Sequence, residues 1–261
     1  MKDGEYSGTF MKDGRMMKGK NVSDHRELVN DVIRRISKGD ISPDKAWSTI
    51  RNLKDRYIET CEKLHPEKDA EQSWHVFIGN SFQNLVYAIL KGYFVNLKKQ
   101  NRIFENLQIL KESEVNKNDI IMRKLAIRYG DYLLLPDTDM VIANYMTEDP
   151  WKSEVLAIVS CKTSLRERIA QACYWKLKLL SCDTTKNVKV FLATTDNDDD
   201  FVLRKTKDEY LGGRSRNRII AEYELDGVYI LREDFINSWE SQKVKRYEHI
   251  FEDMRSIFMN K

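Results

Sequence analysis

The stretch LLLPDTDMVIANYMTEDPWKSEVLAIVSCKTSLRERIAQ, residues 133–171, decides the fold of this chain. Two apolar runs within it, residues 140–143 and 155–159, have the length and composition of buried β-strands. The polar segment between the runs predicts a turn, which would make the two strands antiparallel neighbours. Asp139, directly before the first strand, and Lys162, at the end of the second, would then lie at the same end of the sheet.

Apolar periodicity on both sides of this stretch predicts an α/β protein in which a mixed central sheet is flanked by helices. Helices are expected at residues 23–39, 43–66, 70–100, 165–180 and 239–258, and further strands at 120–121, 132–135, 188–193 and 228–231. The expected organisation is a flexible arm (1–22), a helical N-terminal subdomain (23–118) and a core (119–261) that contains the functional residues.

The composition excludes several classes of protein. The 261 residues include 44 Lys and Arg against 41 Asp and Glu, so any basic surface must be local. No apolar run approaches the roughly 20 residues of a membrane-spanning helix, and the polar N-terminus lacks the apolar core of a secretory signal. The four cysteines have no CxxC spacing, and no Gly-rich phosphate loop is present. We therefore expect a cytoplasmic protein without a zinc site, a membrane partner or a nucleotide cofactor.

Asp139 and Lys162 together suggest phosphodiester chemistry. A carboxylate at a strand end can hold a divalent metal, and a carbonyl oxygen on the next strand can supply a second ligand. A lysine nearby can orient the attacking water or help to deprotonate it. The structural alternative is that Asp137 and Asp139 are turn residues and that Lys162 is a charge on a solvated loop.

A short basic motif follows the lysine. Ser164 is a plausible N-cap, which would put Arg166, Glu167 and Arg168 in the first turn of the next helix. Cations are disfavoured at a helix N-terminus, so two arginines there call for an acceptor-rich partner. Arginine pairs with the acceptors of guanine and glutamate accepts from cytosine, so the motif fits a reader of G·C pairs. An ordinary ion-pair cluster is the alternative.

Local charge is consistent with a nucleic-acid surface. Residues 162–178 carry five basic residues against one acidic residue, and residues 201–218 carry six against two. Arg214, Arg216 and Arg218 lie in the second segment, which resembles a loop that could contact phosphates or flanking bases. The alternative is a solvated loop.

The whole stretch resembles the PD-(D/E)xK restriction endonucleases that cut CCGG- or CCNGG-type sites, and most closely their BsaWI-like branch. In those enzymes the catalytic lysine is followed by an Arg-(Glu/Asp)-Arg recognition motif, as Lys162 is here. The resemblance implies a restriction-endonuclease-like fold. It also implies that Asp139 binds the metal, with the carbonyl of Cys161, and that Lys162 is catalytic. The bases would be read by Arg166, Glu167 and Arg168. Asp137 is the alternative to Asp139 as the metal-binding acid.

One departure from the family concerns the second acid. Some relatives have a small residue two positions before the lysine, as Ser160 is here, but then carry glutamate thirteen or fourteen positions after it. Trp175 and Lys176 occupy those positions in this chain. The remaining candidates are Gln171, Gln83, Glu105, Glu112 and Glu114.

The resemblance implies a type II restriction endonuclease. It would be a Mg²⁺-dependent enzyme that cuts double-stranded DNA at a palindromic CCGG- or CCNGG-type site and leaves 5′-phosphates. A palindrome calls for two readers related by a two-fold axis, so we expect a homodimer or a higher oligomer. A structure-specific repair or resolvase nuclease of the same fold and a non-catalytic DNA-binding regulator are the alternatives.

Overall fold

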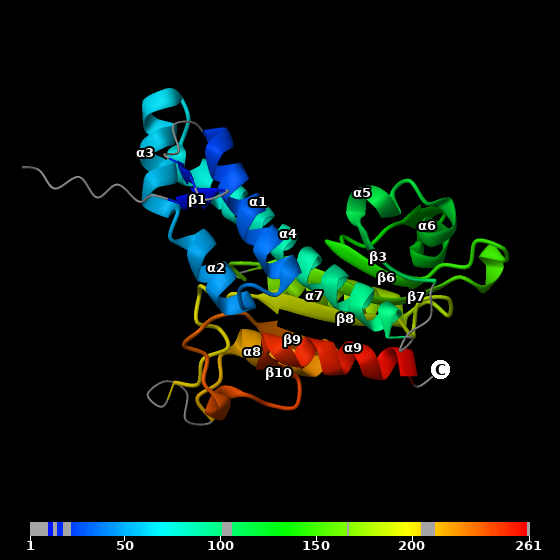
Figure 1. Ribbon diagram of the computed structural model, residues 1–261. Helices are drawn as coiled ribbons and strands as arrows, with labels where there is room; N and C mark the ends of the chain where they lie inside the picture. Colours follow the sequence, from blue (N-terminus) through cyan, green and yellow to red (C-terminus); the bar gives the residue numbers. More distant parts are fainter. Residues whose placement is uncertain are drawn as a thin grey trace, which may run out of the picture. The chain divides into compact units, whose positions relative to one another are not determined.

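The computed structural model describes residues 10–12, 15–17, 22–100, 106–165, 167–204 and 212–259. The chain forms two compact units, Met1–Asn84 and Leu85–Lys261, and the division falls within the long helix α4. Figure 1 follows the chain from the helices of the first unit to the sheet of the second. The expected boundary, between residues 118 and 119, lies further along the chain than this division.

The described part of the first unit is helical apart from one small hairpin. Aromatic rings join its helices: Tyr57 stacks on Phe77 with 4.6 Å between ring centroids, and Trp47 meets Phe82 edge-on at 5.0 Å. The elements are β1 (Phe10–Lys12), β2 (Arg15–Met17), α1 (Val22–Lys38), α2 (Pro43–Arg51), α3 (Lys54–Leu64) and the first half of α4 (Ala70–Lys99). The continuous helix expected over 43–66 is therefore two helices, because Asn52 ends α2 and Leu53 begins the next turn.

The second unit contains a six-stranded mixed sheet in the order β10–β9–β8–β7–β6–β3. The strands are β3 (Leu107–Lys111), β6 (Met140–Asn144), β7 (Glu154–Lys162), β8 (Lys189–Thr194), β9 (Gly227–Ile230) and β10 (Val244–Arg246). Strands β7 to β10 are parallel, whereas β6 is antiparallel to both β7 and β3. The expected mixed sheet and the antiparallel pairing of the two central runs are confirmed, with Met140 opposite Val159.

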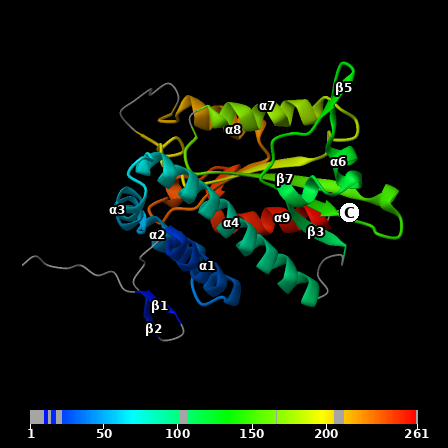
Figure 2. The same ribbon diagram turned by 90° about the horizontal axis from the view of Figure 1, so that it is seen from above.

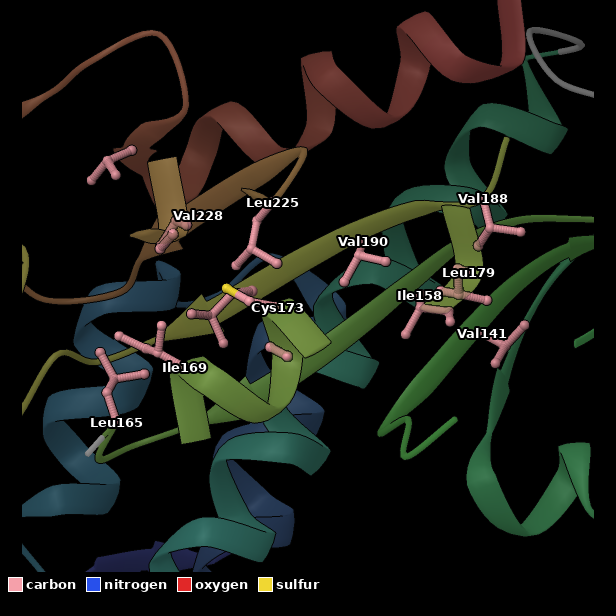
Figure 3. Packing of buried hydrophobic residues seen from close by; sticks show 14 of the residues in the cluster. Val141, Ile158, Leu165, Ile169, Cys173, Leu179, Val188, Val190, Leu225 and Val228 are labelled. Atoms are coloured by element: carbon pink, nitrogen blue, oxygen red, sulfur yellow. The ribbon is translucent and has the colours of Figure 1, made fainter. Parts of the chain in front are cut away.

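One face of this sheet packs against α7 (Arg168–Leu180) and α8 (Arg216–Glu224). The apolar side chains of Ile158 and Val190 on the strands lie against Ile169 and Cys173 of α7 (Figure 3). Alternate residues of a strand point to opposite faces, which is why Val190 and Leu192 of β8, and Val228 and Ile230 of β9, belong to this cluster. This packing holds α7 in a fixed position relative to the end of β7.

The opposite face is covered by α9 (Ile250–Met259) and by residues 85–99 of α4, as Figure 2 shows. Tyr93 of α4 meets Phe251 of α9 with 4.6 Å between ring centroids. Tyr229 of β9 donates a hydrogen bond to Asp253 of α9 at 2.8 Å. Both faces of the sheet are therefore buried, which explains why its inner strands are almost continuously apolar.

Three further expected elements differ from the structure. Ile120 and Ile121 lie in α6 (Asp119–Leu125) and not in a strand, because the Asn118 side chain caps that helix by accepting from the Ile121 N–H. The 132–135 run forms β5 (Tyr132–Leu134), which pairs with β4 (Ile127–Tyr129) in a separate two-stranded sheet. The closing helix, expected over 239–258, begins only at Ile250 as α9. The structure adds α5 (Glu112–Val115) and the 3₁₀ turns η1 (Pro150–Lys152), η3 (Asn237–Trp239) and η4 (Tyr247–His249).

No helix in the described ranges is both long and apolar enough to cross a membrane.

Candidate active site

Asp139 and Lys162 form an ion pair at one end of the sheet. The Nζ atom of Lys162 donates to Oδ2 of Asp139 at 3.1 Å, and the two side chains are 15% and 18% exposed. The backbone N–H of Cys161 donates to the same carboxylate oxygen at 2.6 Å. The antiparallel pairing of β6 and β7 causes this meeting, because the beginning of one strand lies beside the end of the other.

The extended backbone of β7 determines what surrounds this ion pair. Ser160 and Lys162 are two residues apart and share one face of the sheet, while Cys161 points to the other. Burial raises the pKa of the Cys161 thiol well above its usual value, as does the charge of Asp139, so the thiol stays protonated. In a strand the N–H and C=O of one residue point to the same side, so the Cys161 carbonyl also faces β6.

The oxygen ligands available at this strand end suit a hard cation. They are the Asp139 carboxylate, the Cys161 carbonyl and the Ser160 hydroxyl, all oxygen atoms of the kind that Mg²⁺ prefers. Among the described residues no group of three or more His, Cys, Asp or Glu side chains is placed to hold a metal. These oxygen ligands thus fit Mg²⁺ with one carboxylate, and water would complete the coordination shell of the ion.

The other candidate acids and amides lie in different environments. Gln171 of α7 donates from Nε2 to Asp137 at 2.8 Å, and both residues are exposed. Gln83 belongs to the first unit, where it lies half-buried on α4. Glu105 lies outside the described residues. Glu112 and Glu114 are exposed on α5.

Lys176, at one of the two positions where the resemblance implies a second acid, has partners of a structural kind. Its Nζ atom donates to Asp226 at 2.6 Å and to the carbonyl of Val188 at 3.2 Å. Asp226 also accepts from the Val190 N–H at 2.8 Å. These partners lie at the start of β8, whereas Lys162 lies opposite its end, at Thr194. Lys176 therefore stabilises the end of the sheet that is remote from Asp139.

Replacing Asp226 by alanine is expected to lower the free energy of unfolding by about 3 kcal/mol at pH 7, because Lys176 would stay buried without a counter-charge. Burial raises the pKa of Asp226, but hydrogen bonds from Lys176 and Val190 outweigh it and hold the pKa below its usual value. The contribution is thus present above about pH 4 and is lost as the pH falls through the lower, folded-state pKa. Urea unfolding at pH 7 and at pH 2 measures the difference.

Asp183→Ala is the matched control for this prediction, since its carboxylate pairs with Lys186 in full exposure. The control variant should unfold at nearly the urea concentration of the wild type. An equal loss of stability in both variants at pH 7 would contradict the role of the buried pair.

The segment after Lys162 differs from expectation. Ser164 does not cap α7: its Oγ donates to Oδ2 of Asp198 at 2.7 Å. The helix begins at Arg168, with Glu167 as its N-cap and no capping bond from the Glu167 side chain. Both residues are exposed, whereas Arg166 lies outside the described residues. The contact of Asp198 with Ser164 was not predicted, although Asp198 follows closely after the strand expected at 188–193.

The three arginines of the second basic segment are not equivalent, and two of them lie on a helix and not in a loop. Arg216 is exposed at the start of α8, and Arg214 is half-buried with Nε 3.5 Å from Glu222. Arg218 is fully buried on α8, where it donates to Glu222 at 2.9 Å and to the carbonyls of Phe201 and Trp239. The prediction that Arg218 contacts DNA is therefore wrong, because its donors are used inside the protein.

Comparisons with known proteins agree on one enzyme class. Residues 96–253 match a family described as BsaWI restriction endonuclease type 2. The putative type II restriction enzyme MjaVIP of Methanocaldococcus jannaschii is 34% identical over 215 residues, which cover 80% of this chain and 87% of that protein. The probable type II restriction enzyme HpyAORF263P of Helicobacter pylori is 36% identical over 136 residues, 52% of this chain and 66% of that protein.

The solved structures show the fold. The restriction endonuclease PspGI in its complex with substrate DNA superposes with a TM-score of 0.55 and 12% sequence identity. The superposition covers 97% of this chain and all of that one. The restriction-endonuclease-like fold expected from the sequence is thereby confirmed.

Proposed function

Since this chain belongs to the BsaWI family of type II restriction endonucleases, we propose that it cuts both strands of DNA at a palindromic site with a CCGG- or CCNGG-type core. The observation that carries the proposal is the Asp139–Lys162 ion pair at the end of β7. Glu167 and Arg168 follow Lys162 within six residues and are exposed at the beginning of α7. Catalytic and base-reading groups would thus occupy the same end of the sheet.

Asp139 and the carbonyl of Cys161 would hold Mg²⁺, which when bound supplies Lewis-acid stabilisation of the phosphate and lowers the pKa of a bound water. The Nζ atom of Lys162 would donate to a non-bridging phosphate oxygen and orient the attacking water. The Cys161 N–H holds the Asp139 carboxylate in place without using a further side chain. Attack in line with the 3′-oxygen would leave a 5′-phosphate.

Recognition would come from the segment after Lys162. Arg166 and Arg168 would donate to guanine acceptors and Glu167 would accept from a cytosine amino group. Arg214 and Arg216 would contribute contacts to phosphates. A palindromic site presents each half once, so two copies of the chain related by a two-fold axis would bind it, and we propose a homodimer.

Digestion of unmethylated phage DNA tests this function. With Mg²⁺ we expect discrete fragments whose sequenced ends share one G·C-rich palindrome, and with EDTA we expect intact DNA. Intact DNA in both reactions, from protein that circular dichroism shows to be folded, would contradict the nuclease function. Fragments with random ends would contradict the sequence specificity and would favour a structure-specific nuclease.

A further inference from the structure

Two loops lie side by side at the carboxyl ends of β7 and β8. These strands are parallel neighbours, and Lys162 is opposite Thr194 where they end. We call residues 163–167, after β7, the reader loop, and residues 195–201, after β8, the anchor loop. Two hydrogen bonds join them at Thr163, whose carbonyl accepts from Oγ1 of Thr195 at 3.2 Å and from the N–H of Asn197 at 3.3 Å.

Asp198 of the anchor loop makes the strongest of these connections. Its Oδ2 atom accepts from the hydroxyl of Ser164 and from the backbone N–H of Leu165, both at 2.7 Å. Hydrogen bonds to an ionised acceptor are short and about twice as strong as neutral ones. The Leu165 side chain is fully buried, so the same residue is held through its backbone and through its packing.

The anchor loop is itself held from the inside of the protein. The buried carboxylate of Asp196 accepts from the N–H groups of Asp200 and Phe201, at 2.7 Å and 3.0 Å. Arg232 donates from Nη1 to the carbonyl of Asp196 at 2.9 Å and to the carboxylate of Asp199 at 2.8 Å. Asp198 therefore belongs to a loop that is held by hydrogen bonds of its own in addition to those with the reader loop.

We infer that Asp198 is a positioning residue that sets where Glu167 and Arg168 lie relative to Lys162. Only the reader loop connects the end of β7 to α7, and Asp198 holds that loop near its middle. A displacement of about 1 Å of a positioned group can cost 10²-fold in rate. The inference rests on the proposed function, because it assigns the hydrogen bonds of Asp198 a part in sequence discrimination.

Asp198→Ala removes the acceptor for both donors. We expect the ratio of cleavage rates, for the cognate site against a site with one changed base, to fall by about 10-fold or more. Asp198→Asn keeps one oxygen that can accept both bonds and should retain most of that ratio. Both substitutions remove a negative charge and should strengthen binding to any DNA, so the difference between them reports geometry and not charge.

Hydrogen exchange gives a readout that does not need cleavage. The amide of Leu165 should exchange faster in Asp198→Ala than in the wild type and should stay protected in Asp198→Asn. Asp183→Ala is the control, since it removes an exposed acid beyond the far end of α7 and should change neither exchange nor discrimination.

The outcomes separate this inference from the proposed function. Loss of the discrimination ratio and of Leu165 protection in Asp198→Ala, with rescue of both in Asp198→Asn, would support the inference. An unchanged ratio in Asp198→Ala, or an equal loss in the two variants, would overturn it. A wild-type protein without site preference would contradict the proposed function instead, and unchanged Leu165 exchange in Asp198→Ala would overturn the anchoring on its own.

Discussion

Lys162→Ala is expected to lower the rate of DNA cleavage by about 10³-fold while DNA affinity stays within a few-fold of wild type. Orientation of water and proton transfer by a positioned side chain contribute about 10²–10⁴-fold in general. Lys162 is paired with Asp139, with 3.1 Å between Nζ and Oδ2. Single-turnover cleavage with Mg²⁺ measures the rate, and a gel-shift titration in EDTA measures the affinity.

Lys186→Ala provides a matched control, because Lys186 also donates to an aspartate, Asp183, at 2.9 Å, but at an exposed site. This variant should cleave at the wild-type rate. Asp139→Asn should lose cleavage as Lys162→Ala does, while its amide oxygen can still accept from the Cys161 N–H. A Lys162→Ala protein that cleaves within ten-fold of wild type would exclude a catalytic role for this lysine.

Arg218→Ala is expected to lower the free energy of unfolding by about 3–5 kcal/mol, the range for removing one member of a buried ion pair. The guanidinium is completely buried and donates to Glu222 and to two backbone carbonyls. Burial lowers the pKa of Arg218, partly offset by Glu222. Alanine would leave the carboxylate and both carbonyls without their donor, and urea unfolding measures the loss.

Arg216→Ala separates stability from DNA binding. Arg216 is exposed two residues earlier at the start of α8, so its removal should change the unfolding midpoint little. If Arg216 contacts a phosphate, its removal should weaken DNA binding at every sequence and reduce the salt dependence by about one charge. If Arg218→Ala instead left stability unchanged and weakened DNA binding, the structural role of Arg218 would be disproved.

The central strands could be predicted because their sequences allow little else. The apolar runs that became β6, β7, β8 and β9 are short and bounded by polar residues, and both faces of the sheet that they form are buried. Strands β3 and β10 lie at the edges of the sheet and have three to five residues with partly polar faces. Periodicity over so few residues carries little signal, so the prediction missed both.

The sequence alone determined the meeting of Asp139 and Lys162, because two adjacent antiparallel strands bring their ends together whatever surrounds them. Only the tertiary structure decided which partners Ser164, Asp198 and Arg218 bind. Ser164 looks like a cap and Arg218 like a DNA contact when only neighbours along the chain are considered. Ser164 is bonded to Asp198, 34 residues away, and Arg218 is bonded to Trp239, 21 residues away. Hydrogen bonds over such separations depend on how β7, β8 and α8 pack.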